Sequence, residues 1–281
     1  MDGILLVNKP AGITSFDAVR QCRRIYHEKK TGHTGTLDPG AEGLMIILMG
    51  KYTKLIPYCV KNQKHYIAEF MFGIRTDTED IWGTEILKKE PSFHTDEELK
   101  RTADSFVGET DQVPPMYSAL KKNGRPLYSY AREGIEIERK ARRITVDSLT
   151  VSRIGENRFC MDAVVSEGTY IRSLIRDFAD ALGEEAAMTS LKRTAIEHIK
   201  VEDAHAPDEL TEEDLIHDPL RVISRRFPVI QTEEEKKVRS GMDITLPCDS
   251  DIVILVSPVG ELLAAYRKTG KNRYHCERGL F

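Results

Sequence analysis

A single carboxylate, Asp38, stands in the middle of the glycine-rich stretch GHTGTLDPGAEGLM at residues 32–45. Pro39 disfavours a helical backbone at Asp38 and favours an extended one, while Gly35 and Gly40 can take unusual dihedral angles on either side. The stretch runs into the apolar segment LMIILMG, which is typical of a buried strand. A carboxylate presented by such a loop at a sheet edge is suited to acid–base or nucleophilic chemistry.

A phosphate-binding loop and an ordinary turn are the alternatives to a catalytic loop at this stretch. The phosphate-loop pattern fails, because Gly35 and Gly40 have its glycine spacing but Ala41 stands where it requires lysine. An isolated Asp-Pro-Gly tripeptide, by contrast, is a common structural turn. The local sequence alone therefore leaves two interpretations of this stretch, a structural turn and a catalytic loop.

The elements that must position this loop alternate between helices and strands. Ser15 is suited to cap a helix, and Gly183 ends a second helix in GTYIRSLIRDFADALG. The apolar residues of the first helix fall on one side: Phe16, Val19, Cys22, Ile25 and Tyr26. Alternating apolar residues predict half-buried strands in HYIAEFMFG and RFCMDAVVS. Because no strict βαβ rhythm appears, we expect an α+β fold with a mixed, largely antiparallel sheet flanked by helices.

Composition places the chain among ordinary globular proteins. Its 281 residues are 40% hydrophobic and 31% charged, with no apolar run long enough to cross a bilayer and no basic region before a long apolar segment at the start. Five cysteines without a CxxC pair indicate neither a disulfide framework nor a zinc site. We therefore expect a soluble cytoplasmic protein without a metal.

A change of composition near RRFPVI predicts a domain boundary. Beyond it, a short helix in TEEEKKVRSG and a hairpin that turns at Ser257 to Gly260 indicate a small β-rich module. We expect a larger domain at residues 1–227 and this module at residues 228–281.

Charge is segregated along the chain, although the net charge is only −4. Residues 121–143 hold eight Lys or Arg against three Glu and include two tyrosines, and residues 20–30 hold five against one Glu. Residues 202–218 hold eight Asp or Glu and no Lys or Arg. A solvated helix face explains any one such run. Two basic runs, one carrying tyrosines, also fit contacts with nucleic-acid phosphates and bases.

Five stretches together carry a family resemblance. The stretch around Asp38 resembles the catalytic motif of the TruB-type tRNA pseudouridine synthases, and four others agree in order: NKPAGITS, KHYIAEFMFGIRTDTED, QVPPMYSALKKNGRPLYSYAREGIEIERKARRI and SEGTYIRSLIRDFADALG. Residues 228–281 are similar in position and size to the PUA-like RNA-binding module of bacterial members. The resemblance implies a pseudouridine-synthase catalytic domain at 1–227, with a basic thumb-like insertion at 121–143.

The resemblance also implies a reaction: isomerisation of uridine 55 in the T arm of tRNA to pseudouridine, with no cofactor or metal. It implies that Asp38 acts on the ribose, by attack at C1′ or proton abstraction at C2′, or, in an older scheme, at C6 of the base. Arg172 would pair with Asp38; a surface arginine is the alternative. Tyr66 would stack on the target base, Leu191 would line its pocket, and ordinary core positions are the alternative for both.

Further residues are implied in RNA contacts. His33 matches a histidine that contacts the substrate where the loop is opened, and a turn-stabilising donor is its alternative. The cluster RTDTED at residues 75–80 lacks the spacing of a calcium loop and is, by the resemblance, a substrate-facing or structural turn. The predicted phosphate and base contacts are Lys9, Arg23, Arg24, Lys30, Lys121, Arg125, Tyr128, Arg132 and Arg142.

Two alternatives to this function remain open from the sequence. A non-catalytic RNA-binding protein or tRNA-folding chaperone could use the same surface. A guide-RNA-dependent enzyme of ribosomal RNA is the other, although the compact C-terminal module favours a tRNA enzyme that acts alone. We expect a monomer that needs no protein partner and no membrane.

Overall fold

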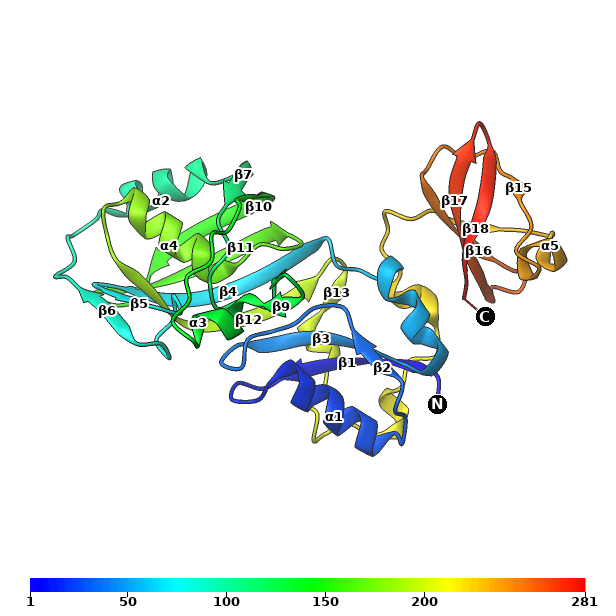
Figure 1. Ribbon diagram of the computed structural model, residues 1–281, viewed down its shortest axis with the longest axis horizontal. Helices are drawn as coiled ribbons and strands as arrows, with labels where there is room; N and C mark the ends of the chain where they lie inside the picture. The colour runs from blue at the N-terminus through cyan, green and yellow to red at the C-terminus, as the bar shows by residue number, and fades with distance from the viewer. Residues whose placement is uncertain (281) are drawn as a thin grey trace. The chain divides into compact units, whose positions relative to one another are not determined.

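The computed structural model describes residues 1–280, which form two compact units (Figure 1). The first unit contains Met1–Pro39, Gly43–Lys61 and the chain from Glu197 on. The second contains Gly40–Glu42 and Asn62–Ile196. The predicted site residues are divided between them: His33 and Asp38 belong to the first unit, and Tyr66, Arg172 and Leu191 to the second.

In the first unit, one buried strand precedes the glycine-rich loop and a second buried strand follows it. Strand β1 (Gly3–Lys9) is antiparallel to β3 (Glu42–Met49), and β2 (Thr31–His33) also pairs with β3. The apolar segment before Gly50 thus forms the predicted strand, and its side chains are buried. The remaining short elements of this part are η1 (Gly50–Tyr58), β13 (Ile199–Lys200), η2 (Val201–Asp203), η3 (Glu212–Asp214) and η4 (Pro219–Val222).

The first helix, α1 (Ser15–Ile25), is capped one residue earlier than predicted. Its cap is Thr14, whose hydroxyl accepts from the backbone of Asp17 while the Asp17 carboxylate accepts from the Thr14 backbone. Of the predicted apolar side, Val19, Cys22 and Tyr26 are buried, whereas Phe16 is 60% exposed. Ala18, which was not among the predicted residues, is buried beside Val19 and Cys22.

In the second unit, five strands form the sheet in the order β12-β4-β11-β10-β7, and all their pairings are antiparallel. The predicted alternation in the central strand is confirmed, because Tyr66, Ala68, Phe70 and Phe72 are buried. The strands are β4 (Gln63–Phe72), β7 (Gly108–Gln112), β10 (Arg142–Arg153), β11 (Arg158–Ser166) and β12 (Ala186–Ile196).

Two helices pack against this sheet, α2 (Asp96–Ser105) and α4 (Ile171–Ala181) (Figure 1). Phe178 of α4 meets Phe70 edge-on with ring centroids 6.0 Å apart, and Phe70 stacks on Phe159 at 5.4 Å. As predicted, α4 ends before Gly183, which has φ of 74°. Two small hairpins and a short helix complete the unit: β5 (Ile74–Thr76), β6 (Glu85–Lys88), β8 (Lys121–Lys122), β9 (Arg125–Pro126) and α3 (Leu127–Ala131).

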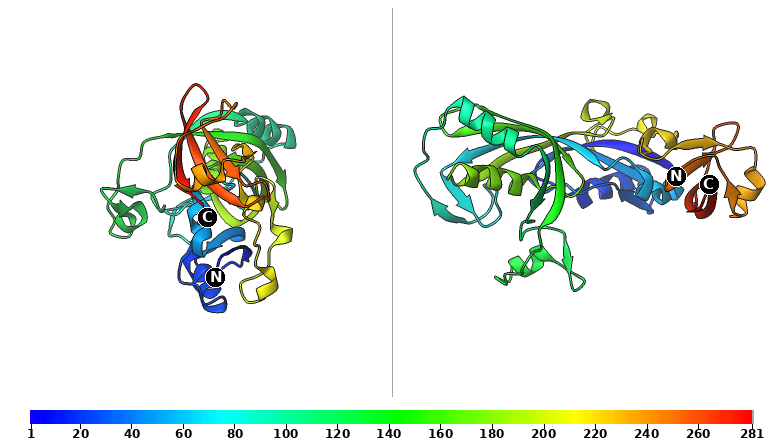
Figure 2. Two further views of the ribbon diagram at one scale, coloured as in Figure 1. Left: turned by 90° about the vertical axis from the view of Figure 1, so that its right-hand side faces the viewer. Right: turned by 90° about the horizontal axis from the view of Figure 1, so that it is seen from above.

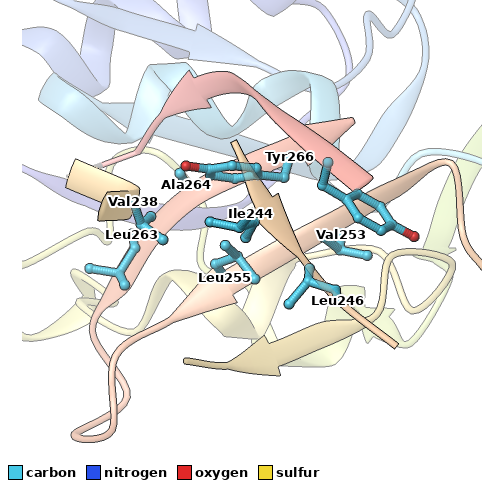
Figure 3. Close-up of a cluster of buried hydrophobic side chains, with 9 residues drawn as sticks. Val238, Ile244, Leu246, Val253, Leu255, Leu263, Ala264 and Tyr266 are labelled. Atoms are coloured by element: carbon cyan, nitrogen blue, oxygen red, sulfur yellow. The ribbon is translucent and has the colours of Figure 1, made fainter. Parts of the chain in front are cut away.

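The C-terminal segment builds its own small sheet, in the order β14-β16-β17-β18-β15. The predicted hairpin is confirmed, because β16 and β17 are antiparallel and the Gly260 amide donates to the Ser257 carbonyl at the turn. Nine buried side chains, among them Leu255, Leu263 and Tyr266, form its core (Figure 3). The elements are β14 (Val229–Gln231), α5 (Glu235–Arg239), β15 (Ile244–Thr245), β16 (Ile252–Val256), β17 (Leu262–Gly270) and β18 (Arg273–Gly279).

The predicted fold class is confirmed: a mixed, largely antiparallel sheet flanked by helices is followed by a small β-rich module. The boundary between residues 227 and 228 stays a prediction. No helix within residues 1–280 is both long and apolar enough to cross a membrane.

Candidate active site

The loop that carries Asp38 is anchored on both sides of the carboxylate. The Ser15 hydroxyl donates to the Leu37 carbonyl at 2.9 Å and accepts from the Leu37 amide at 2.8 Å. The Pro39 carbonyl accepts from the Gly12 amide at 2.8 Å. Asp38 itself is half-buried. The segment NKPAGITS therefore holds the two residues that flank Asp38, which fixes the backbone from which the carboxylate projects.

Lys9 lies at the centre of this anchoring, and not at the surface. Its side chain is fully buried, and its ammonium group donates to the carbonyls of Ile13 at 2.7 Å, Pro10 at 2.9 Å and Pro39 at 3.3 Å. A buried ammonium group must satisfy its donors inside the protein. The prediction that Lys9 contacts phosphate is therefore wrong: Lys9 is a structural residue of the loop.

The other predicted RNA contacts of the first unit lie on or after α1. Arg24 and Lys30 are exposed, whereas Arg23 donates to the Thr31 hydroxyl and its guanidinium lies 5.7 Å from the ring centroid of Phe16. His33 is half-buried at the end of β2, opposite Ile47 of β3. The substrate contact of His33 stays a prediction.

In the second unit, Tyr66 and Leu191 come from neighbouring strands. Tyr66 of β4 lies opposite Ala163 of β11 and Arg193 of β12, and Leu191 of β12 lies opposite Ala68 of β4. Both side chains are buried. Burial fits ordinary packing and a pocket that encloses a base equally well, so the stacking role of Tyr66 stays a prediction.

Arg172 is buried in the first turn of α4, where the helix dipole disfavours a cation. Its guanidinium donates to the carbonyls of Thr78 at 2.7 Å and Tyr117 at 2.9 Å. Its Nε atom lies 3.8 Å from a carboxylate oxygen of Asp80. The Asp80 carboxylate, which lies in the same unit, thus offsets the unfavourable interaction between the Arg172 cation and the start of the helix. Pairing with Asp38 stays a prediction.

Asp80 organises the turn from Thr76 to Thr84 as well as facing Arg172. Its carboxylate accepts from the Thr78 hydroxyl at 2.6 Å and the Trp82 amide at 3.1 Å. The backbone next to it is tied to β12, because the Ile81 amide donates to the Met188 carbonyl at 3.0 Å. The sequence cluster RTDTED is therefore a tightly bonded turn that positions Arg172.

Glu79 in the same turn has the left-handed φ of 65°, which non-glycine residues seldom adopt. Its carboxylate accepts from the Ser173 hydroxyl at 2.8 Å and pairs with Arg176, both on α4. Burial lowers the pKa of Arg176, but the carboxylates of Glu79 and Asp177 outweigh it and the net shift is upward. The Tyr117 hydroxyl donates to Asp77 at 3.1 Å, and burial together with this bond raises its pKa.

The basic insertion projects from the rest of its unit as the bright green segment at the bottom of the right-hand view of Figure 2, except that its last two residues begin β10. Lys121, Tyr128, Arg132 and Arg142 are exposed, with the Arg132 guanidinium 5.4 Å from the Tyr128 ring centroid. Arg125 is half-buried: it pairs with Glu133, donates to Ser129 and lies over the Tyr130 ring. The first four are placed where RNA could reach them, whereas Arg125 braces the insertion.

Two residues of this region were not predicted from the sequence. Asp80 is one acidic residue among several in RTDTED, and nothing local distinguishes it; only the approach of Arg172, 92 positions later in the sequence, does so. Trp82 could have been singled out from the sequence, since it is the only tryptophan of the chain. Within residues 1–280, no three His, Cys, Asp or Glu side chains gather in a way that could hold a metal ion.

Comparison with known proteins identifies the class and then the family. The fold matches a chain of the Cbf5–Nop10–Gar1 complex with a TM-score of 0.73 over 99% of this chain and 85% of that one, at 23% identity. Residues 23–171 match the model of the TruB family pseudouridylate synthase N-terminal domain. The fold is thus that of the pseudouridine synthases. The chain belongs to the TruB family, and it is an isomerase.

Named relatives cover most of the chain. A tRNA pseudouridine synthase B of Clostridium perfringens strain 13 is 46% identical over 215 residues, which are 76% of this chain and 73% of that protein. The protein of the same name from Oceanobacillus iheyensis is 37% identical over 287 residues, covering 97% of this chain and 94% of its own length.

Proposed function

We propose that this pseudouridylate synthase acts on tRNA and isomerises uridine 55 of the T arm, with Asp38 as its catalytic carboxylate. The observation that carries the proposal is the anchoring of the Asp38 loop, in which Leu37 and Pro39 are both bonded to the segment from Lys9 to Ser15. Fixed placement of one carboxylate is what an isomerisation at a ribose requires. The names of the relatives support tRNA as the substrate.

The reaction is balanced without an added reactant. The bond between C1′ and N1 breaks, the base turns, and a bond forms between C1′ and C5, while C5 loses a proton and N1 gains one. An ionised Asp38 could attack C1′ or remove the proton at C2′, and attack at C6 of the base is the third route. Each route places the carboxylate beside the same nucleotide.

The target base must leave the RNA stack before its glycosidic bond can be reached. In our proposal Tyr66 stacks on the extruded base, Leu191 lines its pocket and His33 contacts the opened loop. Arg24, Lys30 and the exposed basic residues of the insertion hold phosphates. The enzyme acts as a monomer in the cytoplasm and requires no protein partner.

The test uses an unmodified T-arm stem-loop whose loop uridine carries tritium at C5. Isomerisation releases this tritium to water, and chromatography of the digested RNA separates pseudouridine from uridine, which has the same mass. We expect release by the wild type, binding without release by Asp38→Asn, and wild-type release by Asp208→Asn, which alters an exposed carboxylate of the acidic segment.

Three other results would contradict the proposal or change its details. If wild type and Asp38→Asn both bind and neither releases tritium, the protein is a non-catalytic binder or modifies another RNA. If Asp38→Asn releases tritium at the wild-type rate, another group performs the chemistry. Release from a different uridine of full-length tRNA would retain the reaction and change the assigned position.

A further inference from the structure

Trp82 presents a large aromatic surface to solvent from a fixed backbone. The side chain of this sole tryptophan is 55% exposed. Its own amide donates to Asp80 at 3.1 Å, and the preceding amide, of Ile81, donates to Met188 of β12 at 3.0 Å. Tryptophan usually buries most of its surface, so an exposed indole on a tightly bonded turn calls for a function.

The indole lies against Gly40, two positions after Asp38 in the chain. A Cβ atom at residue 40 would lie 2.6 Å from Cη2, 2.7 Å from Cζ3 and 2.8 Å from Cζ2 of Trp82, too close for any real contact. Glycine therefore lets one edge of the ring rest on the loop that follows the predicted catalytic carboxylate. A larger residue at this position would displace the ring.

A cation also lies against this loop. The Lys192 ammonium group lies 3.9 Å from Glu42, two residues after Gly40, and is partly exposed. Proteins bind unpaired nucleotides with exposed aromatic rings, on which the bases stack, and with cations, which meet the phosphates. When a target nucleotide flips out of an RNA loop, each adjacent base loses the flipped base as a stacking partner.

We propose that Trp82 is a stacking platform for a base next to the target uridine. This inference rests on the proposed function and adds a specificity contact to it. The turn thus has two roles: Asp80 holds Arg172 on the inside, and the indole receives an unpaired base on the outside. An apolar surface for protein association is the competing explanation, because Ile81 beside it is also exposed.

The first measurement uses Trp82 as its own reporter. The full chain with Asp38→Asn, which prevents turnover, is titrated with the unmodified T-arm stem-loop while tryptophan fluorescence is recorded. We expect saturable quenching at the RNA concentrations at which filter binding shows complex formation. RNA binding by filter assay without any change in Trp82 fluorescence would overturn the inference.

The second measurement compares affinities in the same Asp38→Asn background. Trp82→Ala should bind the stem-loop about 5- to 150-fold more weakly, the loss expected for one base stacked on an aromatic side chain. Trp82→Phe should recover most of that loss. Phe93→Ala is the matched control, since it removes an aromatic side chain that is 81% exposed in the same unit. This control should bind as the parent does.

An abasic scan identifies the stacked base. Removing the base that stacks on Trp82 should weaken RNA binding by the parent protein and leave RNA binding by Trp82→Ala unchanged. The two proteins should then bind this abasic RNA with equal affinity. Gly40→Ala, which displaces the ring, should likewise weaken the parent and not Trp82→Ala.

The outcomes separate the inference from the function on which it rests. If the wild type converts the RNA but Trp82→Ala binds as tightly as its parent, only the inference fails. If Trp82 instead controls self-association in sedimentation, without any effect on RNA affinity, the surface is a protein contact. If the wild type neither binds nor converts the RNA, the proposed function fails, and the inference fails with it.

Discussion

The turn from Thr76 to Thr84 and the insertion at residues 121–143 lie in the same unit but are held in opposite ways. The turn is bonded to distant parts of the chain, because Met188, Arg172 and Ser173 all contact it. The insertion is held mainly by itself and its flanks, as when Lys122 donates to the Glu138 carbonyl. Residues 121–141 also stand away from the sheet (Figure 2), whereas Arg142 and Arg143 begin β10.

Under the proposed function, this difference assigns the positioning of chemistry to the turn and RNA affinity to the insertion. A group that acts on a ribose must be placed within a fraction of an ångström, so its support needs many contacts. A phosphate contact depends on a long-range charge and tolerates movement. Segments with few tertiary contacts open at low free energy. The insertion is thus suited to closing on RNA, and the turn to holding Arg172.

The largest effect should follow from breaking the turn. In Asp80→Ala, Arg172 loses the Asp80 carboxylate beside its guanidinium, and the turn loses two hydrogen bonds. We expect the rate of isomerisation of the enzyme–RNA complex, with enzyme in saturating excess, to fall about 100-fold, the cost of misplacing a catalytic group by about 1 Å. Tritium release under single-turnover conditions measures this rate.

The control for this variant is Asp104→Ala, which removes an exposed carboxylate from α2. It should keep the wild-type rate. If Asp80→Ala weakens RNA binding and leaves the saturated rate unchanged, the turn contributes affinity, and the contrast with the insertion disappears.

The next effect should come from the charge of the insertion. Replacing Lys121, Lys122 and Arg142 with glutamine removes three exposed cations. We expect about tenfold weaker binding near physiological salt, and a salt dependence of log affinity that is shallower by about 0.7 to 0.9 for each phosphate that is no longer neutralised. The saturated rate should not change. Titrations at several salt concentrations measure this, and an unchanged salt dependence would place the RNA elsewhere.

Two glycines compare the rigidity of the two regions directly. A Cβ atom at Gly83 would lie 2.1 Å from the Thr78 hydroxyl and 2.4 Å from the Asp77 carboxylate. Gly83→Ala should therefore lower the free energy of unfolding by about 2–3 kcal/mol, the upper part of the usual cost of overpacking. At Gly124 no atom lies within 4 Å, and only the φ of +79° opposes a side chain. Gly124→Ala should cost about 1 kcal/mol.

Urea denaturation of both variants measures this difference. Equal losses would mean that the turn relaxes around the new methyl group, and that it is less rigid than its hydrogen bonds indicate.

The fold was predictable from the sequence where the signals are local. Alternation in β4 and the stop at Gly183 depend on neighbours along the chain, and both are confirmed. The role of Lys9 was not predictable because lysine is normally exposed, and only the folded loop brings three carbonyls to its ammonium group. The role of Asp80 was not predictable either, since it depends on contact with Arg172 in α4, far along the chain.

The smallest effect should come from loosening the insertion without changing the rest. Arg125 ties the insertion together through Glu133, Ser129 and Tyr130, all within it. Arg125→Gln should leave the urea midpoint of the whole chain unchanged, because exposed ion pairs contribute little to global stability. Limited proteolysis within residues 121–143 should become about twofold faster, since cleavage follows the population of the locally opened form. RNA should protect wild type and variant alike. If the urea midpoint falls instead, the insertion is part of the cooperative fold, and its self-contained bonding does not make it an independently moving segment.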